Sequence, residues 1–311
     1  MIDNPMDILR QFPIRKTRKQ KLAFREAVQS YATRLGYNCT VEKGSMGANN
    51  ILIGDPEMAK YLITAHYDTP ANMLLPNLVT PCNLVVYLLY QILIVGIFIA
   101  ASVTVGILAT LAVNNVALGS QLGMLTYWAL LLIIMVGPAN KNNFNDNTSG
   151  VITVLETAKS MPSQYRNKVC FVLFDLEEAG LIGSSSYQKA HKKHIANQLV
   201  LNMDCVGDGN EIVMFPTKKL RNDADKLADL RRICGAWGEK SIALHDKGFS
   251  FYPSDQANFS YGVGVGAFRR KKGVGLYYSR IHTKKDTVLE ETNVNILRAA
   301  LVSLITCGAV K

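Results

Sequence analysis

The sequence predicts an α/β fold: a doubly wound, mostly parallel central sheet flanked by helices, with an inserted two-helix transmembrane hairpin. Three observations lead to this prediction. Short apolar runs at 60–68, 168–175 and 198–204 each end in polar residues, as parallel strands buried on both faces do. Residues 148–162, between two of these runs, show helical periodicity. Finally, no Asp, Glu, Lys or Arg occurs from residue 69 to residue 140.

Strands that alternate with helices along the chain produce a doubly wound sheet. In residues 148–162 the apolar side chains recur at helical spacing before Pro162, and they are Val151, Val154, Leu155 and Ala158. Residues 18–35 predict an amphipathic helix with basic side chains outward. Its inward side chains are expected to be Leu22, Phe24, Val28 and Tyr31.

The charge-free region contains two apolar runs, at 83–113 and 121–138. The first is long enough to cross a bilayer core of about 30 Å, and the second is at the short end of the spanning range. Residues 114–120 between them predict a polar turn. Aromatic side chains that favour the membrane interface stand near the ends of the runs: Tyr87, Tyr90, Tyr127 and Trp128. A buried core hairpin or an apolar dimerisation arm is the alternative, but such a long stretch without charge is rare in water-soluble chains.

Composition and residue distribution limit the domain organisation and the cellular compartment of the chain. The chain has 311 residues, 49% of them hydrophobic, so it can bury a sizeable core. We expect a discontinuous α/β domain formed by residues 1–82 and 139–311, with residues 83–138 as the inserted hairpin. No signal peptide is expected in residues 1–30, which are polar and basic. Widely spaced cysteines without a C-x-x-C pair are typical of a reduced compartment: Cys39, Cys82, Cys170, Cys205, Cys234 and Cys307.

Candidate ligands for a metal stand at or after the ends of predicted strands, except Asp146, which is expected to open the helix of residues 148–162. They are His66 and Asp68, Asp146, Glu177 and Glu178, Asp204, and His282. Residues at the carboxyl ends of parallel strands converge at one edge of the sheet, so these side chains are expected to lie together. Histidines and carboxylates suit zinc, and a shared carboxylate lets two ions sit close to each other. His66 and Asp68 are two apart on a strand, so the aspartate can accept the second ring N–H of the histidine.

Five short motifs carry a resemblance to a known family. HYD at 66–68, DNTSG at 146–150, EEAGLIGSSSY at 177–187, NMDCVG at 202–207 and HTKKD at 282–286 resemble, in order, the motifs of the co-catalytic zinc aminopeptidases. That family includes the bacterial leucyl aminopeptidase and aminopeptidase S type enzymes, with relatives among glutamate carboxypeptidase and glutaminyl cyclase. The resemblance implies a zinc exopeptidase fold with two Zn²⁺ per chain.

The resemblance also implies a role for each matched residue. His66 and Asp204 would bind one zinc and Glu178 and His282 the other, with Asp146 bridging both. Glu177 would be the general base, and Asp68 would orient His66 from behind. The stretch YPSDQANF at 252–259 resembles the family's Ser-Asp-His segment, but Gln256 stands where the family has histidine. The role of Asp255 therefore stays open, and Tyr252 is kept as a candidate oxyanion donor.

The adjacent pair Glu177 and Glu178 has a chemical explanation of its own. Neighbouring residues project in different directions, so Glu178 can bind a cation while Glu177 faces the water that the cation activates. An acidic surface turn is the ordinary interpretation of a Glu-Glu pair, and the matched motifs argue against it here.

Other polar motifs are given structural interpretations. His191 and His194 are one helical turn apart, but the lysines between them favour a solvated basic face. The glycines of 262–268 are expected near a strand, and His245 in a loop. The basic cluster at 269–272 lacks interleaved aromatic residues, so we expect a solvated loop or a contact to anionic lipid, and no nucleic acid partner.

His66 precedes the apolar runs and Asp146 follows them, so both residues meet only if the chain crosses the membrane an even number of times. Two crossings satisfy this condition. Basic residues at 15–25 and Lys141 place the α/β domain on the cytoplasmic side of the membrane. We therefore predict a two-pass, membrane-anchored zinc aminopeptidase whose partners are peptide substrates and the lipid bilayer, with the oligomeric state left open. The alternatives are a carboxypeptidase or glutaminyl cyclase of the same fold, or a non-catalytic membrane receptor or scaffold.

Overall fold

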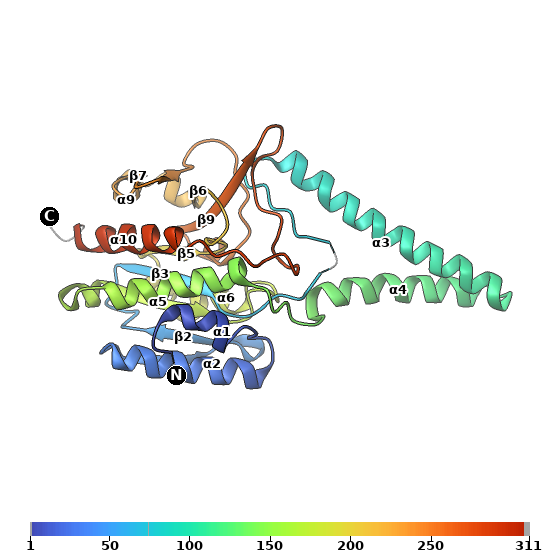
Figure 1. The fold of residues 1–311 in the computed structure, drawn as a ribbon, viewed down its shortest axis with the longest axis horizontal. Coiled ribbons are helices and arrows are strands. Elements are labelled where there is room, and N and C mark those ends of the chain that lie inside the picture. The colour runs from blue at the N-terminus through green and yellow to red at the C-terminus, as the bar shows by residue number, and fades with distance from the viewer. Residues whose placement is uncertain (1, 74, 308–311) are drawn as a thin grey trace.

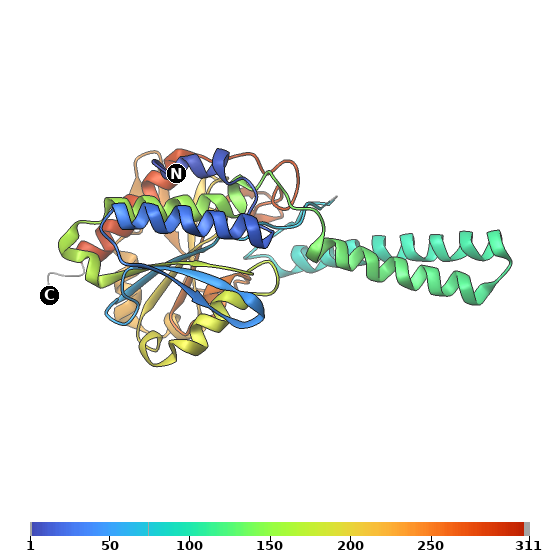
Figure 2. The same cartoon turned by 90° about the horizontal axis from the view of Figure 1, so that it is seen from below.

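A computed structural model describes residues 2–73 and 75–307, in which a mixed sheet lies between helices and a long helical hairpin projects from one end (Figures 1 and 2). The sheet follows the order β1-β2-β4-β3-β5-β9-β6-β8-β7, and β10 pairs with β9. The strands are β1 (Cys39–Lys43), β2 (Asn49–Ile53), β3 (Tyr61–His66), β4 (Val169–Phe174), β5 (Leu199–Met203), β6 (Glu211–Pro216), β7 (Gly235–Trp237), β8 (Lys240–Leu244), β9 (Gly262–Lys271) and β10 (Gly275–Tyr277).

The predicted α/β fold class is confirmed. The central strands β4, β3, β5 and β9 are mutually parallel, and the pairs toward both edges are mostly antiparallel. The three strands predicted from apolar runs are β3, β4 and β5, each fully buried. Because β3 lies between β4 and β5, the carboxyl ends of all three strands meet at one edge of the sheet.

Helices cover both faces of the sheet (Figure 2). One core contains residues from α2 (Arg18–Arg34), α5 (Gly150–Ser160), α9 (Ala224–Arg231) and α10 (Glu291–Cys307). The opposite face packs against α6 (Ile182–Ala190) and α7 (Lys192–Ile195). Two further short helices are α1 (Ile8–Gln11) and α8 (Lys218–Arg221). The four apolar residues predicted to bury α5 are all in the core.

The inward face of α2 differs from the prediction at one residue. Phe24, Val28 and Tyr31 are buried as expected, but Leu22 is 47% exposed. Lys21 takes the inward direction instead, because its ammonium reaches the Asp175 carboxylate at the end of β4, with Nζ 2.5 Å from Oδ1. A buried charge with an ionic partner has therefore replaced the expected apolar contact.

The hairpin consists of α3 (Leu84–Val113) and α4 (Val116–Val136), and both are long and apolar enough to cross a membrane. The predicted turn over residues 114–120 was too long. Asn114 adopts a left-handed conformation with φ 49°, and the Asn115 side chain accepts the amide of Leu118, which caps α4. Residues 116–120 therefore belong to α4. The division into two domains at residues 82 and 139 stays a prediction.

Small residues let α3 and α4 approach closely where they cross. A Cβ added to Gly123 would lie 2.8 Å from the carbonyl oxygen of Ser102, and one added to Gly119 would lie 2.6 Å from that of Gly106. In an apolar solvent such close packing is a main source of helix association.

Gly123→Val is expected to push the two helices apart and to lower the free energy of unfolding by about 1–3 kcal/mol, the usual range for overpacking. Thermal unfolding of the detergent-solubilised protein measures this effect. Gly96→Val is the matched control, because a Cβ at Gly96 has nothing within 4 Å. Equal destabilisation by both variants would mean that close helix contact is not what Gly123 provides.

Candidate metal centre

The structure brings the predicted metal ligands together at the carboxyl edge of the central strands. His66 is the last residue of β3, and Asp204 directly follows β5. Glu177 and Glu178 stand in the turn after β4. Asp146 comes from the turn Phe144–Ser149 that precedes α5, so it does not open that helix as its sequence position suggested.

Asp146 lies between the two histidines. Its Oδ1 is 3.2 Å from Nε2 of His66, and its Oδ2 is 3.0 Å from Nε2 of His282. A second carboxylate lies near each histidine. Asp204 Oδ1 is 3.7 Å from Nε2 of His66, and Glu178 Oε2 is 3.6 Å from Nε2 of His282. Each carboxylate oxygen of Asp146 thus faces a different histidine, each with a further carboxylate beside it.

Glu177 belongs to the same cluster. One potential ligand atom each from His66, Glu177 and Asp204 lies within 4.8 Å of the others, and the same holds for His66, Asp146 and Glu178. A third group includes the thiol of Cys205, whose pKa burial raises well above its ordinary value, which disfavours the thiolate form. The carboxylates and imidazoles are the better donors.

Asp68 contacts the centre in a way that the sequence did not indicate. Its two carboxylate oxygens accept the backbone amides of Glu177, at 3.0 Å, and of Glu178, at 3.2 Å. The expected contact to the His66 ring is longer, with Nδ1 3.5 Å from Asp68 Oδ1. Asp68 therefore fixes the Glu177–Glu178 turn as well as facing the imidazole. Despite burial, the pKa of Asp68 is held below its ordinary value by the His66 imidazole and then by Lys21 and the Glu177 amide.

Two buried ionisable residues that hold the loops of the centre were not predicted from the sequence. Asp286 accepts the backbone amides of Asn145 and Asp146, at 2.8 and 3.0 Å, and burial raises its pKa to about 8. The fully buried Arg15 guanidinium donates to the carbonyl of Tyr67 and to Thr148 Oγ1. Asp286 is the last residue of the HTKKD motif, so its sequence spacing from His282 could have identified it as a residue of the centre. No local pattern distinguished Arg15 from the other basic residues.

Tyr252 lies behind the centre. Its hydroxyl donates to the backbone carbonyl of Asp204 at 2.7 Å, so a role as oxyanion donor would require this hydrogen bond to break. Tyr278 lines the cavity of about 230 Å³ at the centre, together with Glu177 and the five residues proposed to bind metal, whereas Asp68 and Tyr252 are not among the lining residues. The Gln256 side chain bonds Asn202 and the Tyr252 carbonyl within the core, and burial raises the pKa of neighbouring Asp255 to about 7.

Backbone strain also concentrates at this edge of the sheet. Leu176, Cys205 and His282 have left-handed φ values of 56°, 53° and 60°. Residues other than glycine rarely adopt this conformation, and such residues cluster at functional sites where the surrounding structure imposes it. Each of the three is a predicted ligand or is adjacent to one.

The charge in the centre is out of balance without a cation. Burial, then the repulsion of Glu177 and Glu178 with the other carboxylates, raises the pKa of both glutamates well above the ordinary 4.5. Burial alone would lower the pKa of His66, but the surrounding carboxylates raise it well above 6.5. Among the described residues, Glu178 Oε1 and Asp204 Oδ1 are buried without a hydrogen-bond partner. Unpaired oxygens and imidazole nitrogens in one buried cluster are a donor set that fits zinc.

The other histidines do not form a second centre among the described residues. Nε2 of His191 lies within hydrogen-bond distance of Oε2 of Glu42, at 2.6 Å, so this ring contacts a carboxylate and is not part of the solvated basic face that we expected. His245 directly follows β8. The basic cluster at 269–272 also differs from the prediction, because Arg269 and Arg270 lie in β9 and pair with Asp208 and Glu211.

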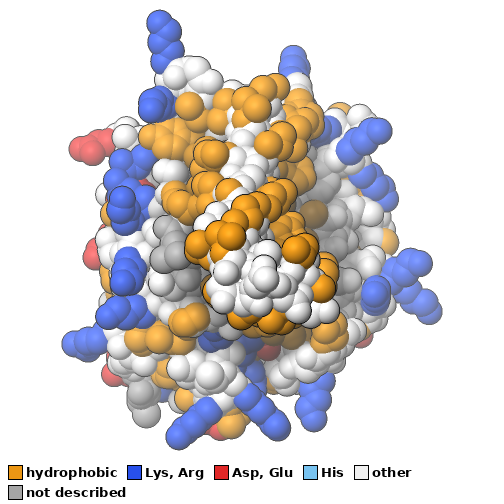
Figure 3. All heavy atoms as spheres, turned by 90° about the vertical axis from the view of Figure 1, so that its right-hand side faces the viewer, with side chains coloured by type: hydrophobic (Ala, Val, Ile, Leu, Met, Phe, Trp, Pro, Cys, Tyr) orange, Lys and Arg blue, Asp and Glu red, His pale blue; other side chains and the backbone are white. Residues whose placement is uncertain are grey.

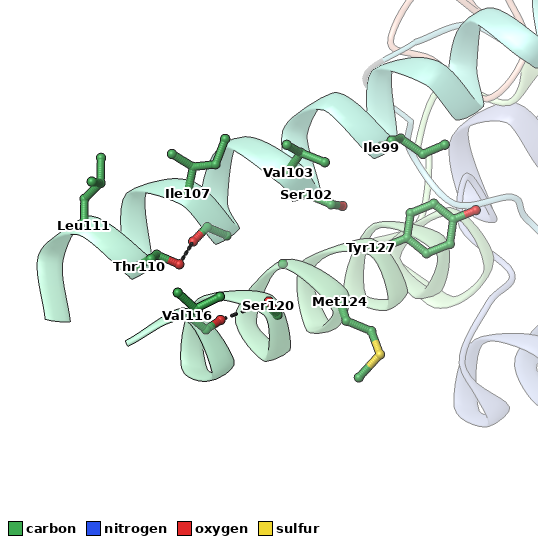
Figure 4. Close-up of a pocket in the computed structure, with 12 residues that line it drawn as sticks. Ile99, Ser102, Val103, Ile107, Thr110, Leu111, Val116, Ser120, Met124 and Tyr127 are labelled. Atoms are coloured by element: carbon green, nitrogen blue, oxygen red, sulfur yellow. Dashed lines mark hydrogen bonds between the residues drawn. The ribbon is translucent and has the colours of Figure 1, made fainter. Parts of the chain in front are cut away.

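A larger cavity of about 660 Å³ lies between α3 and α4, away from the centre (Figure 4). Apolar side chains and small residues line it, and its hydroxyls are occupied within their own helices: Thr110 donates to the Gly106 carbonyl and Ser120 to the Val116 carbonyl. It has no ionisable lining group apart from the Tyr127 phenol, so it differs from the cavity of the metal centre, which carboxylates and imidazoles line.

Comparisons with known proteins identify the family of the chain. Residues 135–304 match the model of Peptidase family M28, which is more than half of the sequence, so the chain belongs to that family of zinc-dependent enzymes. The match does not include His66 and Asp68. No curated protein matches the sequence.

Solved structures share the fold. The LapA aminopeptidase of Legionella pneumophila is 13% identical with a TM-score of 0.61, over 99% of this chain and 72% of that one. The Porphyromonas gingivalis glutaminyl cyclase is 13% identical with a TM-score of 0.58, over 99% and 98%. The Bacteroides thetaiotaomicron glutaminyl cyclase bound to N-acetylhistamine is 15% identical with a TM-score of 0.56, over 97% and 94%. Such low identities establish the fold alone.

The titration of the centre predicts how zinc stabilises the protein at different pH. A carboxyl whose pKa is raised in the folded state destabilises that state as pH rises above the unfolded value, here 4.5. A histidine whose pKa is raised stabilises the folded state below 6.5 and loses this contribution as pH rises through its folded pKa. Both effects make the metal-free protein less stable as pH rises from 4.5 through neutrality, and zinc competes with the protons responsible.

We therefore expect the increase in Tm on adding zinc to be larger at pH 8 than at pH 5.5, as measured by calorimetry on the full chain after chelation. Mg²⁺ is the control, because it prefers six oxygen ligands and should produce little shift. A zinc effect that is constant or shrinks with rising pH would contradict the assignment of these groups as ligands.

Proposed function

We propose that the protein is a membrane-anchored aminopeptidase that uses two zinc ions. The observation that carries this proposal is the position of Asp146, whose two oxygens face His66 and His282 separately. His66 and Asp204 would hold one ion, His282 and Glu178 the other, and Asp146 both. When bound, the zinc ions supply Lewis acidity that polarises a peptide carbonyl and lowers the pKa of water.

Glu177 is the base in this proposal. It lies beside His66 and Asp204, and Asp68 holds its backbone amide in place. Burial raises the pKa of its carboxyl, while a positive charge close by would lower it again, so the group can take a proton and release it. Oε1 or Oε2 would accept a proton from the attacking water and pass it to the leaving amine.

The proposed roles predict different effects on zinc binding and on rate when each glutamate is substituted. Glu177→Gln leaves every proposed ligand in place, so zinc should stay bound while kcat falls by about 10²- to 10⁴-fold. Glu178→Gln removes a charged ligand, so one ion should bind more weakly and excess zinc should restore part of the activity. Zinc content and rate are measured for both variants across a zinc titration. Loss of metal in Glu177→Gln with retention in Glu178→Gln would exchange the two roles.

The composition of the cavity wall supports cleavage at the amino end of peptides. No lysine or arginine is among the described residues that line the cavity, so nothing there is suited to hold a substrate carboxylate. Arg269 and Arg270 are paired elsewhere. A carboxypeptidase is therefore disfavoured. A glutaminyl cyclase is the second candidate, because two of the similar structures bear that name. The complete set of proposed ligands argues against a non-catalytic receptor or scaffold.

Substrate blocking separates these activities. We expect release of the first residue from unblocked peptides and no turnover of the same peptides after acetylation, because a free amine would contact the acidic centre. Peptides that begin with glutamine are included, and mass spectrometry distinguishes loss of a residue from loss of ammonia. Ring closure without cleavage would make the protein a cyclase, and equal turnover of acetylated peptides would exclude an aminopeptidase.

The membrane part of the proposal rests on α3 and α4, whose large apolar side chains are mostly exposed to solvent in the isolated chain. Two crossings return the chain to the side on which it began. Basic residues at 15–25 and Lys141 favour the cytoplasmic side for the α/β domain.

A reporter fused after Lys311 should be active on the cytoplasmic side, and activity on the opposite side would reverse the orientation.

A further inference from the structure

The cavity of the metal centre is built in part from the segments that lead into the hairpin. Asn77 and Val79, which line the cavity, precede the first residue of α3 by seven and five positions. Val79 exchanges backbone hydrogen bonds with Tyr278, which also lines the cavity, at 3.1 and 3.2 Å. Five residues span at most about 18 Å, so the first turn of α3 is close to the cavity wall.

The second segment is attached to the same place. The chain after α4 pairs with the chain before α3, since the Asn72 amide donates to the Pro138 carbonyl at 2.7 Å. The next amide, that of Met73, donates to the carbonyl of His282, also at 2.7 Å. The loop that carries a proposed ligand is thus hydrogen-bonded to the base of the hairpin. Figure 1 shows both helices leaving the domain from this end.

Residues 251–253 connect the first turns of α3 with the cavity wall. The Phe251 amide donates to the Pro81 carbonyl at 2.8 Å, and its ring lies 5.4 Å from that of Tyr87 in α3. Phe249 and Phe251 are 54% and 41% exposed, although Pro253, two residues further on, lines the cavity. Exposed aromatic rings at the end of an apolar helix are typical of the membrane interface.

Basic side chains stand on the other side of the hairpin base. Lys141, Lys284 and Lys285 are exposed, and the Asn142 side chain donates to the Lys284 carbonyl, which joins the two loops that carry them. In Figure 3, which looks along the hairpin towards the domain, lysine and arginine side chains surround the apolar helices and acidic ones are fewer. This distribution suits a surface that rests on anionic lipid headgroups.

We propose that the metal centre opens towards the membrane surface and acts on peptides whose free amino terminus is carried on a membrane-bound segment. This proposal rests on the proposed aminopeptidase function. Insertion of α3 and α4 places the lipid headgroups beside the aromatic and basic residues at the hairpin base. A substrate anchored in the same bilayer then needs only a short free segment to reach the cavity. Its effective concentration at the cavity is higher than that of a soluble peptide.

Fluorescence quenching tests the geometry without any enzymatic reaction. Phe249→Cys is labelled with a polarity-sensitive fluorophore in a Cys307→Ser background, and the full chain is reconstituted into vesicles whose lipids carry a quencher near the headgroup. Lys192→Cys is the control, because α7 precedes β5 and so lies at the amino ends of the strands, the opposite end of the sheet. We expect at least about twofold quenching at position 249 and little at 192, since interfacial groups lie within about 10 Å of the headgroups. Equal quenching at both positions, or more at 192, would overturn the proposal.

A series of anchored peptides tests the substrate class. Peptides with one amino-terminal sequence are joined to an apolar helix through spacers of about 6, 12 and 24 residues, so the shortest spacer reaches about 20 Å when extended. We expect cleavage with the shortest spacer and a kcat/KM at least about tenfold above that of the same peptide without the anchor. Cleavage of the unanchored peptide with resistance of the short-spacer peptide would overturn this proposal and leave the aminopeptidase function intact. Failure to cleave either peptide by the zinc-loaded enzyme would reject the aminopeptidase function, and with it this substrate class.

Discussion

Mutual repulsion among buried carboxylates is the constraint on which the rest of the structure depends. Asp146, Asp204, Glu177 and Glu178 meet at the ends of β3, β4 and β5 with only two imidazoles among them. Like charges about 4 Å apart repel by about 4 kcal/mol at an effective dielectric constant of about 20. Burial, and then this repulsion, raises the pKa of both glutamates, and the surrounding carboxylates raise that of His66, so protons relieve the repulsion in the metal-free protein. Divalent cations would relieve it without giving up the negative charge that a general base needs.

Holding such a cluster in place requires support from groups that do not bind metal. Asp68 fixes the Glu177–Glu178 turn through two backbone amides, and Asp286 fixes the Asp146 turn in the same way. Arg15 connects the chain after β3 with the turn before α5, through Tyr67 and Thr148. The contacts of Asp68 and Arg15 join residues before the apolar insertion to residues after it. The edge of the sheet that positions the ligands therefore also carries the hairpin.

The sequence was informative where a pattern is local. Buried strands, the helix at α5 and the existence of two long apolar helices follow from periodicity and composition, and the structure has them. The order of the motifs around His66, Asp146, Glu178, Asp204 and His282 was sufficient to expect that these residues meet. Their assignment to individual ions stays a prediction, because no local pattern specifies which oxygen faces which ion.

Contacts between distant segments could not be predicted in this way. The inward direction of Lys21 depends on Asp175, and the engagement of the Tyr252 hydroxyl depends on the Asp204 carbonyl. Arg269 and Arg270 formed part of an apparent loop because their partners Asp208 and Glu211 are about 60 residues away. The end of the predicted turn was wrong for a different reason, since the capping of α4 by Asn115 outweighs the polar character of the residues after it.

Anomalous diffraction at the zinc edge from crystals of the zinc-loaded protein tests the central claim most directly. The account predicts two zinc peaks about 3.5–4 Å apart, one on each side of the Asp146 carboxylate. One peak should contact His66 and Asp204, and the other His282 and Glu178. A single peak, or a pair of ions that does not share Asp146, would contradict the account.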